Sequence, residues 1–118
     1  MSLSIVIVDD DPAFRAVACS LLAARGFTVL AQAGDLSSGL TAIAEHNPDA
    51  VLLDLQMPDS DGLTASPSIH RVSPDARILL TSAGERVPSE SELATAGVTA
   101  FLPKERLATT DLTSLLWP

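Results

Sequence analysis

Short apolar runs alternate along the chain with longer segments in which apolar residues recur every three or four positions. The runs have the length and β-branched content typical of strands, and the segments between them have the period of helices that bury one side. We expect strands at residues 4–8, 27–31, 50–54, 76–82 and 99–103. The run AVLLD at 50–54 is apolar up to its last residue, which is typical of a strand covered on both faces.

The first two expected helices follow from this periodicity. The first ends at Gly26, and its inward side is expected to carry Phe14, Val17, Ala18, Leu21 and Leu22. The second spans about residues 36–46 and stops before Asn47-Pro48, because a residue before proline disfavours helical geometry. Its inward side is expected to carry Leu36, Leu40, Ile43 and Ala44.

The remaining helices are marked less clearly. The third, near residues 63–72, contains Pro67, which must lie in its first turn or kink it. Pro88 and Ser89 open a fourth helix that ends at Gly97. A fifth runs from about residue 107 or 109 to residue 116. Five β/α units in this order predict an α/β fold, a parallel sheet between helices.

The chain shows no repeat, low-complexity segment or linker, so residues 1–118 are expected to form a single domain. Residues 1–3 could be a cloning remnant and are left out of the fold. The apolar fraction of 47% suits a packed core, and the net charge of −8 argues against direct nucleic-acid binding. One cysteine, Cys19, excludes an internal disulfide. With no membrane span or signal peptide in the sequence, we expect a soluble cytoplasmic domain.

Polar residues end or directly follow four of the expected strands at their carboxyl ends. They are Asp9, Asp10, Asp54, Thr81, Ser82 and Lys104. In an open α/β sheet the functional crevice lies outside the carboxyl ends of the strands. Lys104 is the only lysine of the chain, which makes its position among these acids the more unusual. This edge is therefore the predicted site.

The chemistry of these groups narrows the function. Clustered carboxylates suit Mg²⁺, which binds a few carboxylates and keeps several waters. A lysine and a hydroxyl beside them could stabilise charge on phosphoryl oxygens. His46 and His70 fall on expected helices away from this edge, so no constellation for acyl transfer is present. The set fits phosphoryl transfer to a carboxylate nucleophile.

Four sequence blocks resemble the receiver domain of two-component response regulators, and the NarL-type subset most. The blocks are VDDDP, LLDLQMPDSDGL, LLTSAG and AFLPK, in the family order across essentially the whole chain. The resemblance implies a flavodoxin-like (CheY-like) doubly wound fold with strand order 2-1-3-4-5 and five helices. It also implies a signalling protein that catalyses only its own phosphorylation and autodephosphorylation.

The resemblance assigns roles to individual residues. Asp54 would be the phosphoacceptor, taking a phosphoryl group from a sensor histidine kinase or a phosphotransfer protein. Asp10 would bind Mg²⁺ (or Mn²⁺) directly and Asp9 through water, with Asp54 and the backbone carbonyl of Gln56 as further metal ligands. Lys104 would pair with Asp54 and then with the phosphoryl oxygens. The third acid of the first block, at position 11, is better explained as a cap of the first helix.

A hydroxyl and an aromatic residue would carry the switch. The hydroxyl is Ser82, with Thr81 as the alternative. Ser82 precedes the small residue Ala83, which would leave room for the phosphoryl group beside it. Phe101, three residues before Lys104, matches the aromatic that moves inward when the hydroxyl moves. Its ordinary role as a core residue is compatible with this.

The chain departs from the family pattern at one position, and several of its properties do not follow from the resemblance. Glu105 follows Lys104 where receivers commonly have proline, and the isomer of the Leu102-Pro103 bond is left open. The resemblance places Gln56 and Gly84 at positions that in the family tune how fast the phosphoryl group is lost. The fourth helix, fifth strand and fifth helix form the family's usual signalling face, which could make a homodimer. A stand-alone receiver and a piece of a longer regulator with an output domain both remain open.

Two other functions compete with the receiver. A phosphatase or phosphotransferase with an aspartyl nucleophile would usually need a second acid two residues after Asp54, where Gln56 stands, or a cap domain. A protein-binding scaffold that no longer accepts phosphate would be expected to lack part of the acid pair, Asp54 or Lys104. All are present.

Overall fold

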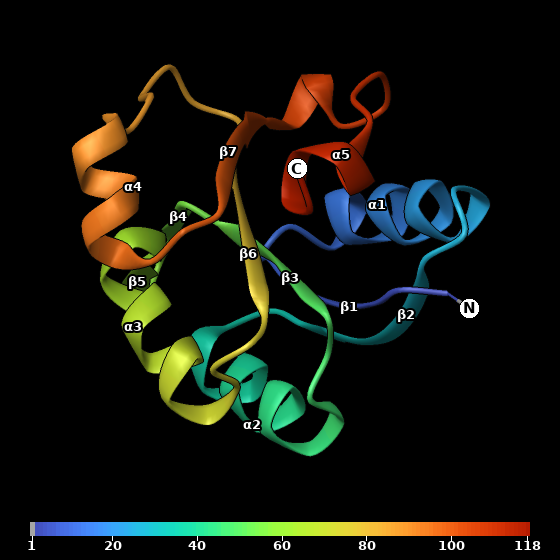
Figure 1. The fold of residues 1–118 in the computed structure, drawn as a ribbon, viewed down its shortest axis with the longest axis horizontal. Coiled ribbons are helices and arrows are strands. Elements are labelled where there is room, and N and C mark those ends of the chain that lie inside the picture. Colours follow the sequence, from blue (N-terminus) through green and yellow to red (C-terminus); the bar gives the residue numbers. More distant parts are fainter. Residues whose placement is uncertain (1) are drawn as a thin grey trace.

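The computed structural model describes residues 2–118, in which five parallel strands form one sheet with helices on both faces (Figure 1). The strands are β1 (Ser4–Val8), β2 (Thr28–Ala33), β3 (Ala50–Asp54), β6 (Arg77–Ser82) and β7 (Ala100–Pro103). Their order in the sheet is β2-β1-β3-β6-β7, and every neighbouring pair is parallel. Counted along the chain this is the predicted order 2-1-3-4-5, so the doubly wound fold is confirmed.

The helices divide between the two faces of this sheet. They are α1 (Pro12–Ala24), α2 (Leu36–His46), α3 (Gly62–Val72), α4 (Glu90–Ala96), α5 (Leu112–Leu116) and the short 3₁₀ helix η1 (Lys104–Arg106). In Figure 1, α1 and α5 lie on one side of the strands, and α2, α3 and α4 lie on the other. Two apolar clusters correspond to these layers, one with Leu22 and Leu116 and one with Ile43 and Ile69.

The central strand β3 is buried along its whole length, as its apolar run predicts. Val8 of β1 pairs with Leu53, and Asp54 pairs with Thr81 of β6. Because all these strands are parallel, this register brings the ends of β1, β3 and β6 to one edge of the sheet. The residues that follow them are therefore neighbours.

Glycine permits two close contacts between helices and the sheet. A Cβ on Gly62, at the start of α3, would lie 2.5 Å from a methyl carbon of Leu80 and 2.8 Å from the carbonyl oxygen of Asp54. A Cβ on Gly39 of α2 would lie 2.9 Å from Val8. Real side chains do not reach such distances, so a larger residue would push the helix away from the sheet.

The close approach at Gly39 corrects one prediction about α2. Gly39 and Ile43 are the buried residues of this helix, and Ala44, which we expected to point inward, is exposed. In α1, Val17 is likewise 62% exposed although we placed it on the inward side. The buried side of α1 is centred on Ala18 and Leu22 instead.

The beginning of α5 was also predicted wrongly. Asp111 caps this helix by accepting a hydrogen bond from the backbone N–H of Ser114 at 3.2 Å, so the helix starts only at Leu112. Residues 107–110 form a turn instead, and the guanidinium of Arg25 donates to the carbonyls of Leu107 (3.0 Å), Ala108 and Thr110 (2.6 Å). These donors satisfy carbonyls that helical hydrogen bonds would otherwise have used.

Other boundaries were predicted more closely. Helix α4 lies between its cap Ser89 and Gly97, as expected. Pro67 lies inside α3 and beyond its first turn, so the first of our two alternatives for it is wrong. The segment after β3, expected as a loop, contains a small antiparallel pair, β4 (Gln56–Met57) and β5 (Ser60–Asp61).

Three smaller findings concern the rest of the described chain. All peptide bonds within residues 2–118 are trans, including Leu102-Pro103. Met1 lies outside the described residues, whereas Leu3, which we had left out of the fold, packs partly against the core and accepts a hydrogen bond from the N–H of Thr28 at 2.8 Å. None of the helices in residues 2–118 combines the length and apolar content that a membrane crossing requires.

Candidate functional site

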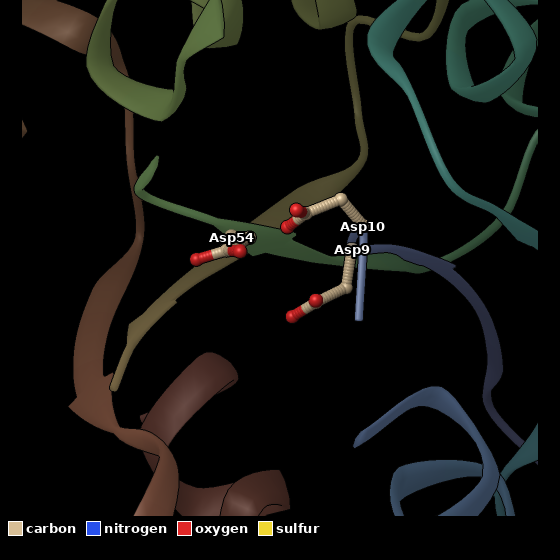
Figure 2. Close-up of side chains that lie close together, drawn as sticks. All are labelled: Asp9, Asp10 and Asp54. Atoms are coloured by element: carbon tan, nitrogen blue, oxygen red, sulfur yellow. The ribbon is translucent and has the colours of Figure 1, made fainter. Parts of the chain in front are cut away.

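Three carboxyl groups meet at the carboxyl edge of the sheet, and Figure 2 shows them side by side. Asp9 and Asp10 follow β1, and Asp54 is the last residue of β3. One oxygen from each lies within 4.8 Å of the others. The structure thus brings Asp54 beside the adjacent acids Asp9 and Asp10, which lie far from it in the sequence, as we expected.

The three acids differ in burial. Asp9 is 1% exposed and Asp54 5%, whereas Asp10 is exposed. Burying an ionised carboxylate is costly unless a positive group or hydrogen bonds compensate. The two buried acids of this site are therefore expected to have positive or hydrogen-bonding partners.

Lys104 supplies part of that positive charge. It follows β7, and its Nζ lies 2.8 Å from Oδ2 of Asp9 and 3.6 Å from Oδ2 of Asp54. Only 13% of its side chain is exposed. The ammonium group also lies over the ring of Phe14 in α1, 4.3 Å from the ring centroid.

Backbone and side-chain donors hold Asp9 in place. Its Oδ1 accepts a hydrogen bond from the N–H of Asp11 at 2.9 Å, and its carbonyl oxygen accepts one from Arg15 at 2.6 Å. Its Oδ2 is buried and accepts no hydrogen bond from residues 2–118, so the nearby ammonium of Lys104 offsets its charge without an aligned bond. Asp11 itself caps α1 by accepting from the N–H of Ala13 at 3.0 Å.

The pKa of Asp54 is raised from 3.8 to about 6, chiefly because burial disfavours its ionised form. The negative charge of Asp9 raises this pKa further. Lys104 and the N–H of Gln56, which donates to Oδ1 at 3.3 Å, act in the opposite direction. A divalent cation among the three carboxylates would favour the ionised form more strongly than Lys104 alone.

The donor set fits such a cation. Mg²⁺ takes oxygen ligands and is usually bound by one or two carboxylates with water in its other positions. The cluster offers two buried acids and one exposed acid, which leaves room for water on the open side. The predicted contribution of the Gln56 carbonyl stays a prediction.

The two candidate hydroxyls at the end of β6 have different surroundings. The Thr81 hydroxyl is fully buried and donates to the carbonyl of Leu53 at 3.4 Å. Ser82 is 2% exposed, and its hydroxyl accepts a hydrogen bond from the N–H of Gly84 at 3.0 Å. Successive side chains of a strand point to opposite faces, so only one of the two can face a phosphoryl group on Asp54.

The loop after β6 lies beside the loop after β3. A Cβ on Gly84 would lie 3.4 Å from Oε1 of Gln56 and 3.6 Å from the Ser82 hydroxyl, so these three residues are neighbours. Ala83, between Ser82 and Gly84, is exposed. Phe101 of β7 is partly buried and packs against the apolar cluster on the α2, α3 and α4 side. Its predicted movement stays a prediction.

Sequence reasoning missed two contacts of this site. Phe14 was predicted only as a core residue of α1, and Arg15 was assigned no role. Neither contact could be found by spacing, because each depends on how α1 packs beside the ends of β1 and β7. Their proximity to the acid block was the only available signal.

Comparison with known proteins shows which family has a sequence similar to this chain. Residues 5–116 match the family model described as the response regulator receiver domain. The chain is 34% identical to the chemotaxis protein CheY of Bacillus subtilis, covering 88% of this chain and 87% of that protein. It is 36% identical to the response regulator MprA of Mycobacterium ulcerans, of which it spans 44%.

A solved structure agrees with the sequence comparison. The signal receiver domain of a response regulator described as NarL, from Mycobacterium tuberculosis, superposes with a TM-score of 0.83 at 26% identity. The match covers 99% of this chain and 98% of that one. The likeness therefore extends over the whole sheet and all the helices around it.

Proposed function

The chain belongs to the response regulator receiver domain family, and on that premise we propose that Asp54 is its phosphoacceptor, with Mg²⁺ as cofactor. The observation that carries this proposal is the buried carboxylate of Asp54, which shares the ammonium of Lys104 with Asp9 and lies beside Asp10. A group in such surroundings can act as a nucleophile toward phosphorus.

In the proposed reaction one oxygen of ionised Asp54 attacks the phosphorus atom of a phosphohistidine. The new O–P bond forms as the P–N bond breaks, and the imidazole leaves with the electron pair of that bond. When bound, Mg²⁺ (or Mn²⁺) would neutralise negative charge on the transferring phosphoryl oxygens. Asp9 and Asp10 would hold it together with Asp54 and the backbone carbonyl of Gln56.

Lys104 and Ser82 would stabilise the product. The ammonium of Lys104 is already 3.6 Å from Asp54 and carries a charge opposite to that of the phosphoryl oxygens. The hydroxyl of Ser82 would donate to one of these oxygens, with Ala83 leaving space beside it. Thr81 is the weaker candidate because its hydroxyl already donates to the carbonyl of Leu53.

The phosphodonor partner would be a sensor histidine kinase or a phosphotransfer protein that docks beside this edge. Helix α1 begins next to the acids, and Val17 on it is 62% exposed. We expect Val17→Asp to slow transfer from a phosphorylated histidine phosphotransfer domain, but not from acetyl phosphate. Val72→Asp is the matched control, because Val72 is also exposed but lies at the far end of α3. Equal effects of both variants would contradict docking at α1.

The output of the switch is a further proposal. Movement of Ser82 toward the phosphoryl group would draw Phe101 inward and change the surface formed by α4, β7 and α5. That surface could form a homodimer, which light scattering before and after phosphorylation would detect. Family members such as MprA are longer than this chain, so an output domain or another protein partner would belong to the whole protein. The cytoplasmic location stays a prediction.

The decisive experiment is intact-protein mass spectrometry after incubation with acetyl phosphate and Mg²⁺. We expect one added phosphoryl group, which is absent from Asp54→Asn and from a sample with EDTA. Asp75→Asn is the matched control, since it removes an exposed aspartate outside the site. If Mg²⁺ binds and no phosphoryl group is added, the proposed function is wrong and the scaffold alternative is favoured.

A further inference from the structure

We propose that Phe14 is a positioning residue of this site, and that its ring holds the ammonium of Lys104 between the carboxylates of Asp9 and Asp54. The inference rests on the proposed function, because it assigns Phe14 a part in phosphoryl transfer. It concerns a residue that none of the predicted metal or phosphoryl contacts includes.

The geometry of the contact supports this role. Phe14 lies in the first turn of α1, and its ring packs against the apolar cluster on the α1 and α5 side of the sheet. The 4.3 Å between Nζ and the ring centroid is well within the range of a cation–π interaction, in which the negative face of the ring attracts the charge. The ammonium therefore has a ring on one side and carboxylates on another.

The position of Lys104 before the reaction explains why such a contact would matter. Its Nζ is closer to Asp9, at 2.8 Å, than to Asp54, at 3.6 Å. A phosphoryl group on Asp54 would draw the ammonium away from Asp9. The ion pair with Asp9 weakens as the ammonium moves away from it, whereas attraction to a ring face tolerates small displacements. The ring can thus retain the ammonium while its carboxylate partner changes.

Burial strengthens the contact. The Lys104 side chain is only 13% exposed, and a cation–π interaction is worth more when the cation has lost much of its water. An aliphatic side chain at position 14 could pack against the lysine stem, but it has no negative face to attract the ammonium. The proposal therefore predicts that an aromatic ring, and not merely apolar volume, is needed.

Phe14→Leu tests this directly. We expect the rate of phosphorylation by acetyl phosphate to fall about fivefold, the size that a typical partly buried cation–π contact would give. Phe14→Tyr keeps the ring and should restore the rate to within about twofold of wild type. Phe27→Leu is the matched control, because Phe27 belongs to the same apolar cluster and is 6% exposed. Phe27→Leu should lower the stability of the protein but leave the rate of phosphorylation unchanged.

The coupling to Lys104 is measured in a second background. When Phe14→Leu is added to the Lys104→Met variant, the rate of phosphorylation should not fall further, because the ammonium that the ring attracts has already been removed. The same fivefold loss in that background would overturn the proposal. So would a rate for Phe14→Tyr that is as low as that of Phe14→Leu.

A spectroscopic signature separates this inference from the proposed function. Protons on Cε of Lys104 should show an upfield NMR shift from the ring current of Phe14, present in wild type and Phe14→Tyr and lost in Phe14→Leu. Absence of this shift in wild type overturns the inference alone. A normal shift in a wild-type protein that accepts no phosphoryl group overturns the proposed function, and the positioning role with it.

Discussion

Two clusters in this molecule each place one cation between two carboxylates. In the first, Lys104 lies beside Asp9 and Asp54. In the second, Arg86 joins Asp61 at 3.0 Å and Glu92 at 3.1 Å, and so links the beginnings of α3 and α4. The side chains of the first cluster are between 1% and 13% exposed, and those of the second between 41% and 47%.

The pKa values of carboxyl groups in the two clusters are shifted in opposite directions. The pKa of Asp54 is raised, chiefly by burial. The pKa of Glu92 is lowered, chiefly by a hydrogen bond from the backbone N–H of Ser89 at 3.0 Å, with Arg86 as a smaller cause. Water around the second cluster already stabilises its charges. The comparison teaches that the same pairing of charges leaves a carboxyl group with a raised pKa only where the protein excludes water from it.

The largest difference between the clusters should appear when the cation is removed. Lys104→Met leaves two buried acids without their positive partner, so the free energy of unfolding in EDTA should fall by about 3 kcal/mol near neutral pH. Mg²⁺ should restore more stability to this variant than to wild type, because it replaces the lost charge. Arg86→Met is the matched control and should change little. Urea denaturation with and without Mg²⁺ measures both, and equal losses would contradict the comparison.

A second prediction concerns the charge of Asp54. Since its pKa rises from 3.8 unfolded to about 6 folded, the folded state holds this proton more tightly. Ionisation of Asp54 therefore does not lower the free energy of unfolding below about pH 4. The loss of stability grows as the pH rises toward 6 and is complete above it. In EDTA, Asp54→Asn should stabilise the protein by about 3 kcal/mol near pH 7.5 and give no gain near pH 4. A gain independent of pH would show that the cause is not this ionisation.

The smallest effect is expected at the exposed cluster. Arg86→Gln should change the midpoint of urea denaturation only slightly, because exposed ion pairs contribute little to stability. Added salt should remove even that difference, since it screens exposed charges, whereas the loss in Lys104→Met should persist. Denaturation at low and high NaCl tests this. A large salt-resistant loss in Arg86→Gln would mean that its link between α3 and α4 matters to the fold.

The sequence was most informative about the sheet and the site edge. The apolar runs identified the five strands, and alternation with helices implied that they are parallel. Parallel strands end at one edge, so Asp9, Asp54 and Lys104 could be placed together because each lies at or directly after the end of a strand. The cap at Asp11 and the bounds of α4 could also be predicted, because they depend on nearby residues. A short polar side chain caps a helix by binding backbone N–H groups within a few residues.

Tertiary packing decided what local patterns leave open. Ala44 faces out because Gly39 lets α2 approach Val8 closely and so sets the rotation of the helix. The delayed start of α5 reflects hydrogen bonds from Arg25, which is distant in sequence. Likewise, the contact between Phe14 and Lys104 joins α1 to the start of η1, directly after β7. Periodicity identifies which residues a helix can bury, but the contacts between distant elements select its rotation, its ends and the neighbours of each charge.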